Sequence, residues 1–139
     1  MTEHQTVLLQ VTDLAVDYGK TQALAGLNLR LQQGQLLCLL GPSGCGKSTL
    51  LRAIAGFQEV TAGGITVANR LLSGGGVNVA PEQRGIGMVF QDVALFPHLT
   101  VRANIAFGLH QWSAEDTRHR VENLMSMVDL SGFAERYPH

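Results

Sequence analysis

Residues 41–49 read GPSGCGKST and fit the pattern G-x-x-x-x-G-K-[ST], in which a glycine-rich loop wraps around a phosphate group. The apolar run LLCLL at 36–40 precedes this loop and has the length of a buried strand. The run LLRAIAG at 50–56 follows with a helical pattern and a glycine where a helix would end. Strand, glycine loop and helix in this order are the context that the motif requires. The stretch therefore predicts a nucleotide-phosphate site in an α/β fold.

Each residue type in this loop suits a phosphate site. Glycine permits backbone conformations closed to other residues, so successive N–H groups can converge on one anion, and the following helix adds the positive end of its dipole. Lys47 would reach the β- and γ-phosphates and act in catalysis, and the Ser48 hydroxyl would ligate Mg²⁺. A chance glycine turn beside a surface lysine is the alternative, but Lys20 is the only other lysine. The loop residues predicted to bind nucleotide are Ser43, Gly44, Cys45, Gly46, Lys47, Ser48 and Thr49.

Composition limits the classes of function. The 139 residues make one domain or a piece of a larger one, and 45% hydrophobic residues suffice for a core. A net charge of −1 gives no basic surface, which argues against nucleic acid as a partner. The N-terminus is polar, and no apolar run approaches the roughly 20 residues of a membrane span, so we expect a soluble, cytosolic chain. Cys38 is interpreted as a small buried residue and Cys45 as a thiol open to alkylation beside the phosphate.

The N-terminal third has strand patterns. Residues 6–18 are rich in β-formers, and Leu27, Leu29 and Leu31 alternate with polar residues as in a half-buried strand. Short strands are also predicted at 65–67 and 86–90, the second ending at Gln91. The domain interpretation is one partial domain over 1–139, with an antiparallel β layer at 1–35, a phosphate-loop core with an inserted hairpin at 36–91, and the start of a helical subdomain at 92–139.

Two helices are predicted in the last part of the chain. Thr100 is a plausible N-cap for a helix that runs to Gly108, because Pro97 keeps the preceding residues out of helical conformation. Ser113 with Asp116 resembles a capping box. The helix that follows Ser113 places four apolar side chains on one face, namely Val121, Leu124, Met125 and Val128.

With these residues in view, the chain resembles the N-terminal portion of an ABC transporter ATP-binding subunit over nearly its whole length. Tyr18 falls where that family places an aromatic ring that stacks on adenine, and Gln91 falls at the family's Q-loop glutamine, which implies roles in catalysis and at Mg²⁺. The alternatives are that Tyr18 packs at a strand end and that Gln91 is a polar strand terminator. The block LFPHLTV at 95–101 is similar to the segment after the Q-loop in importers of ferric iron, polyamines, sulfate or maltose-type sugars, with ferric iron favoured.

The resemblance implies a set of partners. Leu95, Phe96 and Leu99 would form an apolar patch for a helix of the transmembrane permease subunits, unless they are ordinary core residues. A second ATP-binding subunit would complete the ATP sites as a dimer, and a substrate-binding protein would act indirectly outside the membrane. The chain would then lie on the inner face of the bacterial cell membrane through the permease.

Parts of the family pattern are absent from this sequence. No apolar run ending in Asp-Glu follows residue 92, the switch histidine is missing, and neither LSGGG at 72–76 nor LSGF at 130–133 is accepted as the LSGGQ signature. The chain is interpreted as a fragment that binds ATP and Mg²⁺ without appreciable turnover alone. The competing classes are a non-transport ABC ATPase, a binding-only module, and a P-loop GTPase or kinase; the GTPase guanine motif Asn-Lys-x-Asp is absent.

Overall fold

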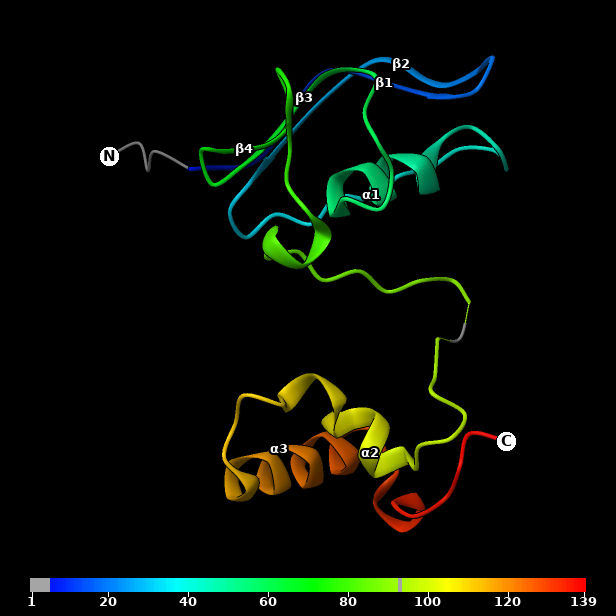
Figure 1. Cartoon of the computed structure of the whole chain (residues 1–139), viewed down its shortest axis with the longest axis vertical. Helices are drawn as coiled ribbons and strands as arrows, with labels where there is room; N and C mark the ends of the chain where they lie inside the picture. The colour runs from blue at the N-terminus through cyan, green and yellow to red at the C-terminus, as the bar shows by residue number, and fades with distance from the viewer. Residues whose placement is uncertain (1–5, 93) are drawn as a thin grey trace. The chain divides into compact units, whose positions relative to one another are not determined.

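The computed structural model describes residues 6–92 and 94–139, and it forms two compact units, Met1–Met88 and Val89–His139 (Figure 1). The first holds a β-sheet, one α-helix and the phosphate loop, and the second is helical.

The described part of the first unit contains an antiparallel sheet with the strand order β2-β1-β3-β4-β5. Its members are β1 (Val7–Tyr18), β2 (Thr21–Gln32), β3 (Ala62–Val67), β4 (Arg70–Gly74) and β5 (Val77–Asn78). The strands expected at 6–18, 27–31 and 65–67 are therefore present, and the second of them is longer than its alternation indicated. The expected antiparallel β layer is confirmed.

Helix α1 (Lys47–Ala55) covers one face of this sheet (Figure 1). The core lies between them and consists of the buried residues Val11, Leu14, Val16, Leu24, Leu50, Ala53 and Ile65. Gly56 ends α1 in the left-handed conformation with φ 92°, as its position in the sequence indicated. The helix is thus held by its apolar face, with the phosphate loop at its N-terminal end.

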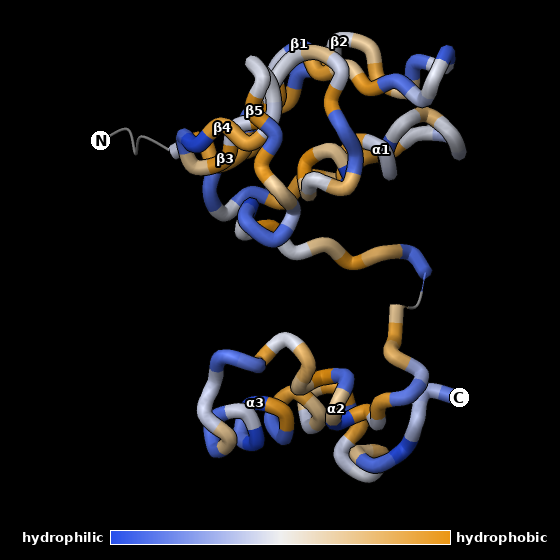
Figure 2. The backbone as a smooth tube through the Cα atoms, viewed as in Figure 1, coloured by the Kyte–Doolittle hydropathy of each residue, from blue (hydrophilic) through white to orange (hydrophobic). Residues whose placement is uncertain are grey.

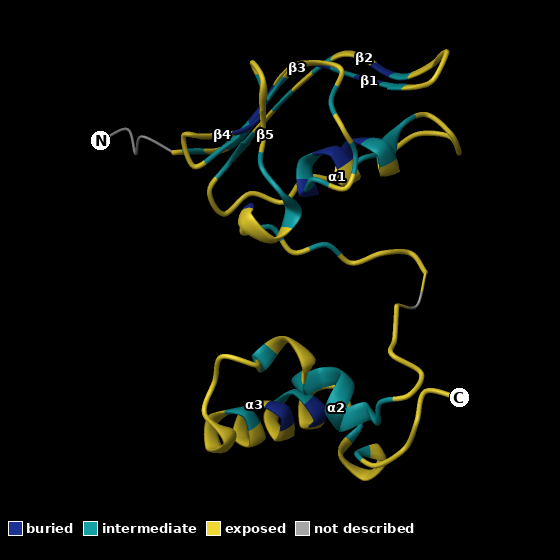
Figure 3. Ribbon diagram, in the orientation of Figure 1, coloured by how far each residue is buried: buried dark blue, intermediate teal, exposed yellow. Residues whose placement is uncertain are grey.

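The strand expected at 36–40 is wrong for this structure. Residues 35–40 have no regular secondary structure, and most of this stretch is exposed (Figure 3), with Leu36 97% and Leu40 88% accessible. Cys38 is likewise exposed, not buried. The physical reason is pairing: a strand buried on both faces needs hydrogen-bonded neighbours, and no described strand pairs with this stretch.

The strand expected at 86–90 is also wrong. After the short 3-10 turn η1 (Pro81–Gln83), residues 86–90 run without regular structure, although they are largely apolar (orange in Figure 2). Val89 is 97% exposed. Both incorrect predictions rest on a short apolar run, the pattern of a strand buried in a parallel sheet. Such a run becomes a strand only beside a partner strand, which the local sequence does not supply.

The second unit packs α2 (Val101–Ala106) against α3 (Ala114–Met127), with 3-10 turns η2 (Phe107–Leu109) and η3 (Ser131–Phe133). Both N-caps are confirmed, because the Thr100 and Ser113 side chains accept hydrogen bonds from the Ala103 and Asp116 N–H groups. α2 continues as η2 beyond Ala106, so the expected helix to Gly108 ends in a tighter turn.

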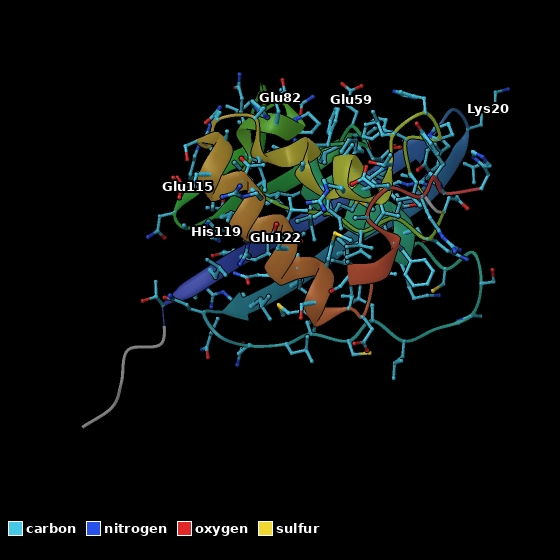
Figure 4. All side chains as sticks on the ribbon, turned by 90° about the horizontal axis from the view of Figure 1, so that it is seen from below. Lys20, Glu59, Glu82, Glu115, His119 and Glu122 are labelled. Atoms are coloured by element: carbon cyan, nitrogen blue, oxygen red, sulfur yellow. The ribbon has the colours of Figure 1, made fainter. Side chains whose placement is uncertain are left out.

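Helix α3 has two faces. Val121 and Met125 are buried and Leu124 is half-buried, whereas Val128 lies beyond the end of the helix and is 60% exposed. Glu115, His119 and Glu122 lie along the exposed side of α3 (Figure 4). No helix within 6–92 and 94–139 is both long and apolar enough to cross a membrane.

Candidate functional site

Gly44 and Gly46 shape the turn of the phosphate loop into α1. Gly44 and Gly46 have φ of 82° and 93°, which side chains rarely adopt. A Cβ on Gly46 would also lie 2.7 Å from Leu24 Cδ2 and 2.8 Å from the Ala23 carbonyl oxygen. Gly46 therefore lets the loop turn into α1 while lying directly against β2.

The N-terminus of α1 is open. The first helical bond is donated by Leu50 N–H to the Gly46 carbonyl at 2.9 Å, so the N–H groups of residues 46–49 precede it. No side chain of the described residues caps this end, and no acidic residue occupies the first turn. A helix that ends in this way, with its dipole uncompensated, favours an anion.

Lys47 folds its side chain back over the loop. Its ammonium donates to the carbonyl oxygens of Gly41 at 2.8 Å and Pro42 at 2.7 Å, and lies 3.4 Å from Cys45 Sγ. The positive charge is therefore held within the loop. Lys20, by contrast, projects from the turn between β1 and β2 (Figure 4).

The remaining loop residues are close to Lys47 in the sequence. Ser43, Cys45 and Ser48 are exposed and Thr49 is half-buried. Ser48 is in the first turn of α1, so its hydroxyl is at the open helix end. A hydroxyl oxygen is a hard donor that suits Mg²⁺ together with phosphate oxygens, so Ser48 fits the predicted ion.

Tyr18 lies in the same unit as the loop. It ends β1, pairs with Thr21 and is 46% exposed. The neighbouring pair Val16 and Leu24 belongs to the same hairpin, and Leu24 is the residue that Gly46 approaches. The hairpin that carries Tyr18 therefore packs against the loop, and its ring remains accessible.

The other predicted residues belong to the second unit. Gln91 is exposed, and its approach to the phosphate site remains a prediction. Leu95 and Phe96 are 50% and 37% exposed, and Leu99 is half-buried. The centroid of the Phe96 ring lies 4.2 Å from that of the Phe107 ring, and Phe107 was not part of the predicted apolar patch.

A family model described as "ABC transporter" matches residues 24–139. The chain belongs to the ABC transporter family. Among curated relatives, the sulfate/thiosulfate import ATP-binding protein of Synechococcus elongatus is 44% identical over 99% of this chain and 40% of its own length. The spermidine/putrescine import ATP-binding protein of Photobacterium profundum is 42% identical over 99% of this chain and 37% of its own length.

An Fe(3+) ions import ATP-binding protein of Haemophilus influenzae is also 42% identical, over 95% of this chain and 38% of its own length. The chain thus spans about two fifths of the length of these relatives. The relatives confirm the resemblance to import ATP-binding subunits and show several cargo types, of which ferric iron is one.

Solved structures confirm the mixed α/β fold of an ABC ATPase. An ATP-binding cassette dimer in a post-hydrolysis state, bound to ADP and Pi, matches with a TM-score of 0.80 and 27% identity, over 94% of this chain and 62% of its own. A protein from Clostridium perfringens that is part of an ABC transporter complex matches with 0.73 and 26%, over 96% of this chain and 55% of its own.

Two residues of this ABC chain were missed by sequence analysis. Asn104 in α2 accepts from Phe96 N–H at 2.9 Å and donates to the Phe96, Leu99 and Thr100 carbonyls at 3.0–3.1 Å. Arg84 is only 5% exposed, and burial lowers the pKa of its guanidinium from the ordinary value. Asn104 lies between the apolar residues Ala103 and Ile105, and Arg84 lies between Gln83 and Gly85; neither local pattern reveals the partners.

Proposed function

We propose that this chain is the ATP-binding part of an ABC importer subunit and that it binds Mg·ATP at the phosphate loop. The observations that carry the proposal are the uncapped N-terminus of α1 and the Lys47 ammonium, which the Gly41 and Pro42 carbonyls hold within the same loop. An anion there would gain the helix dipole, the N–H donors and a full positive charge together.

The residues take separate roles in this proposal. Lys47 would bind the β- and γ-phosphates and stabilise the charge of the transferring phosphoryl group, and Ser48 would ligate Mg²⁺. Tyr18, accessible on the hairpin beside the loop, would stack on adenine. Gln91 would orient water or ligate Mg²⁺. Bound Mg²⁺ would neutralise phosphate charge.

Turnover is proposed to require more than these residues. Within the sequence, no apolar run ending in Asp-Glu supplies a carboxylate to activate water, and no accepted signature motif is present. We therefore expect the 139-residue chain to bind nucleotide with hydrolysis near background. In the whole subunit, ATP hydrolysis would drive import.

The proposed partners are permease subunits of the membrane, a second ATP-binding subunit and, indirectly, a substrate-binding protein. The exposed side chains of Leu95, Phe96 and Phe107 support an apolar docking patch, because large apolar groups at a surface mark contact sites. The subunit would then lie on the cytoplasmic face of the membrane. Ferric iron is the proposed cargo, and the names of the relatives support sulfate and polyamines equally.

Calorimetric titration with Mg·ATP and Mg·GTP tests the nucleotide site. We expect ATP to bind more tightly than GTP, and Lys47→Ala to weaken both by about a hundredfold, because a charge-assisted contact to phosphate is lost. Arg52→Ala is the matched control, since it removes a positive charge from the exposed last turn of the same helix. Equal affinity in wild type and Lys47→Ala would refute the site.

A further inference from the structure

Arg84 connects three parts of the first unit through one buried guanidinium. Its Nη1 donates to the carbonyl oxygens of Ala53 at 2.9 Å and Ile54 at 3.0 Å, in the last turn of α1. Its Nη2 donates to Ser73 Oγ and Asn78 Oδ1 in the β4–β5 hairpin. Nε donates to the Val79 carbonyl at 2.7 Å. All five acceptors are neutral.

The C-terminal end of α1 is shaped to receive this side chain. Phe57 N–H bonds to the Arg52 carbonyl and Gly56 N–H to the Ala53 carbonyl, which is the Schellman pattern of a helix end. This pattern leaves the Ile54 carbonyl for Arg84. A Cβ on Gly56 would lie 2.5 Å from Arg84 Nε, so glycine is required for the approach as well as for the φ of 92°.

Arg84 and the phosphate loop occupy opposite ends of one short helix. α1 has nine residues, which corresponds to a length of about 13 Å at 1.5 Å per residue. Because backbone hydrogen bonds link successive turns of α1, a shift of its C-terminal end would also move Gly46 and Lys47. Arg84 is followed by Gly85, with φ 68°, and by the segment that leads toward Gln91.

Stability alone does not account for a charge at this place. A buried cation costs desolvation, and apolar residues of similar volume often replace buried charges without loss. No carboxylate of the described residues forms an ion pair with Arg84. What the guanidinium provides is a fixed fork that reaches α1 and the hairpin at once, which a lysine cannot reproduce.

We propose that Arg84 is a positioning residue for nucleotide binding: by joining the C-terminal end of α1 to the β4–β5 hairpin, it holds the phosphate loop at the other end in its binding geometry. This inference rests on the proposed nucleotide site. It assigns a function at the loop to a side chain that does not touch the phosphates.

The test compares variants that cut different branches of the fork. Arg84→Lys removes the joint contact with α1 and the hairpin. The double variant Ser73→Ala/Asn78→Ala removes only the Nη2 acceptors and leaves the bonds to the α1 carbonyls. Arg70→Lys is the control for an arginine on the same hairpin, because Arg70 is exposed and donates to the Gln83 carbonyl at 2.9 Å.

Mg·ATP affinity is measured by calorimetry on the whole 139-residue chain, at a temperature where urea titration shows each variant fully folded. We expect Arg84→Lys to weaken binding about tenfold or more, since displacement of a site by about 1 Å has large effects. The Ser73→Ala/Asn78→Ala double variant loses the Nη2 bonds to the hairpin and is expected to weaken binding severalfold, whereas Arg70→Lys is expected to bind within about twofold of wild type at that same folded state.

The outcomes separate this inference from the proposed function. If wild type binds no nucleotide, the phosphate site itself is refuted. If wild type binds and folded Arg84→Lys binds equally well, the positioning role is refuted while the site stands. If Arg84→Lys fails to fold, Arg84 serves stability only; if the folded double variant binds as tightly as wild type, the link to the hairpin does not position the loop. Either outcome overturns the proposal.

Discussion

Gly44 and Gly46 share a left-handed backbone, yet their surroundings differ. Apart from Gly44 and its two chain neighbours, no atom of residues 6–92 or 94–139 lies within 4 Å of a Cβ on Gly44, whereas a Cβ on Gly46 would press against Leu24 and the Ala23 carbonyl. We expect Gly44→Ala to cost about 1 kcal/mol of unfolding free energy from its φ alone. Gly46→Ala should cost about 3 kcal/mol or more, because the backbone of β2 must also shift. Urea titration of both variants measures the difference.

The same pair tests how the loop is built. Gly46 approaches β2, so Gly46→Ala should also displace the start of α1 and abolish Mg·ATP binding, while Gly44→Ala retains measurable affinity. Equal losses of stability in the two variants would show that the close approach to Leu24 does not exist in solution.

At the scale of the element, α2 and the loop before it depend on Asn104. Its side chain bonds both the N–H and the carbonyl of Phe96 and two further carbonyls, so it fixes residues 96–100 against the helix. We expect Asn104→Asp to destabilise the second unit by about 2–3 kcal/mol, because an acceptor-only carboxylate would face three carbonyl oxygens. Amide exchange of Phe96 and Val101 reports the loss.

The pH dependence of that variant has a definite sign. Carbonyl oxygens disfavour the charged form and raise the pKa of the introduced carboxyl in the folded state above its usual value of about 3.9. The folded state then binds the proton more tightly than the unfolded one, so the loss should shrink as pH falls toward that value. Asn123→Asp, on the exposed side of α3, should show neither effect.

These elements also show which features the sequence could predict. The caps Thr100 and Ser113, the helix end at Gly56 and the β1–β2 hairpin are set by neighbouring residues, and all were predicted correctly. Arg84 and Asn104 form hydrogen bonds with residues distant in the sequence or with backbone carbonyls. No local sequence pattern identifies such partners. The runs at 36–40 and 86–90 match strands in composition, but a strand forms only with a neighbour, and pairing is not a local property.

At the scale of the whole molecule, the stretch before the phosphate loop leaves apolar surface uncovered. Leu36 and Leu40 are 97% and 88% exposed, and Leu37 is 43% exposed. Leu29, Leu31 and Ile54 line an adjoining apolar groove between the sheet and α1. Exposed apolar patches of this kind promote association, so we expect the 139-residue chain to self-associate as its concentration rises.

The double variant Leu36→Gln/Leu40→Gln tests whether the side chains of Leu36 and Leu40 are exposed or buried in solution. Since both side chains already face water, we expect the free energy of unfolding to change by less than about 0.5 kcal/mol, and the association seen by sedimentation to fall. Leu14→Ala, at a fully buried core position, should cost about 3 kcal/mol. If the double variant costs as much as Leu14→Ala, residues 36–40 pack as the buried strand that their apolar pattern indicates, and the loop is anchored from both sides.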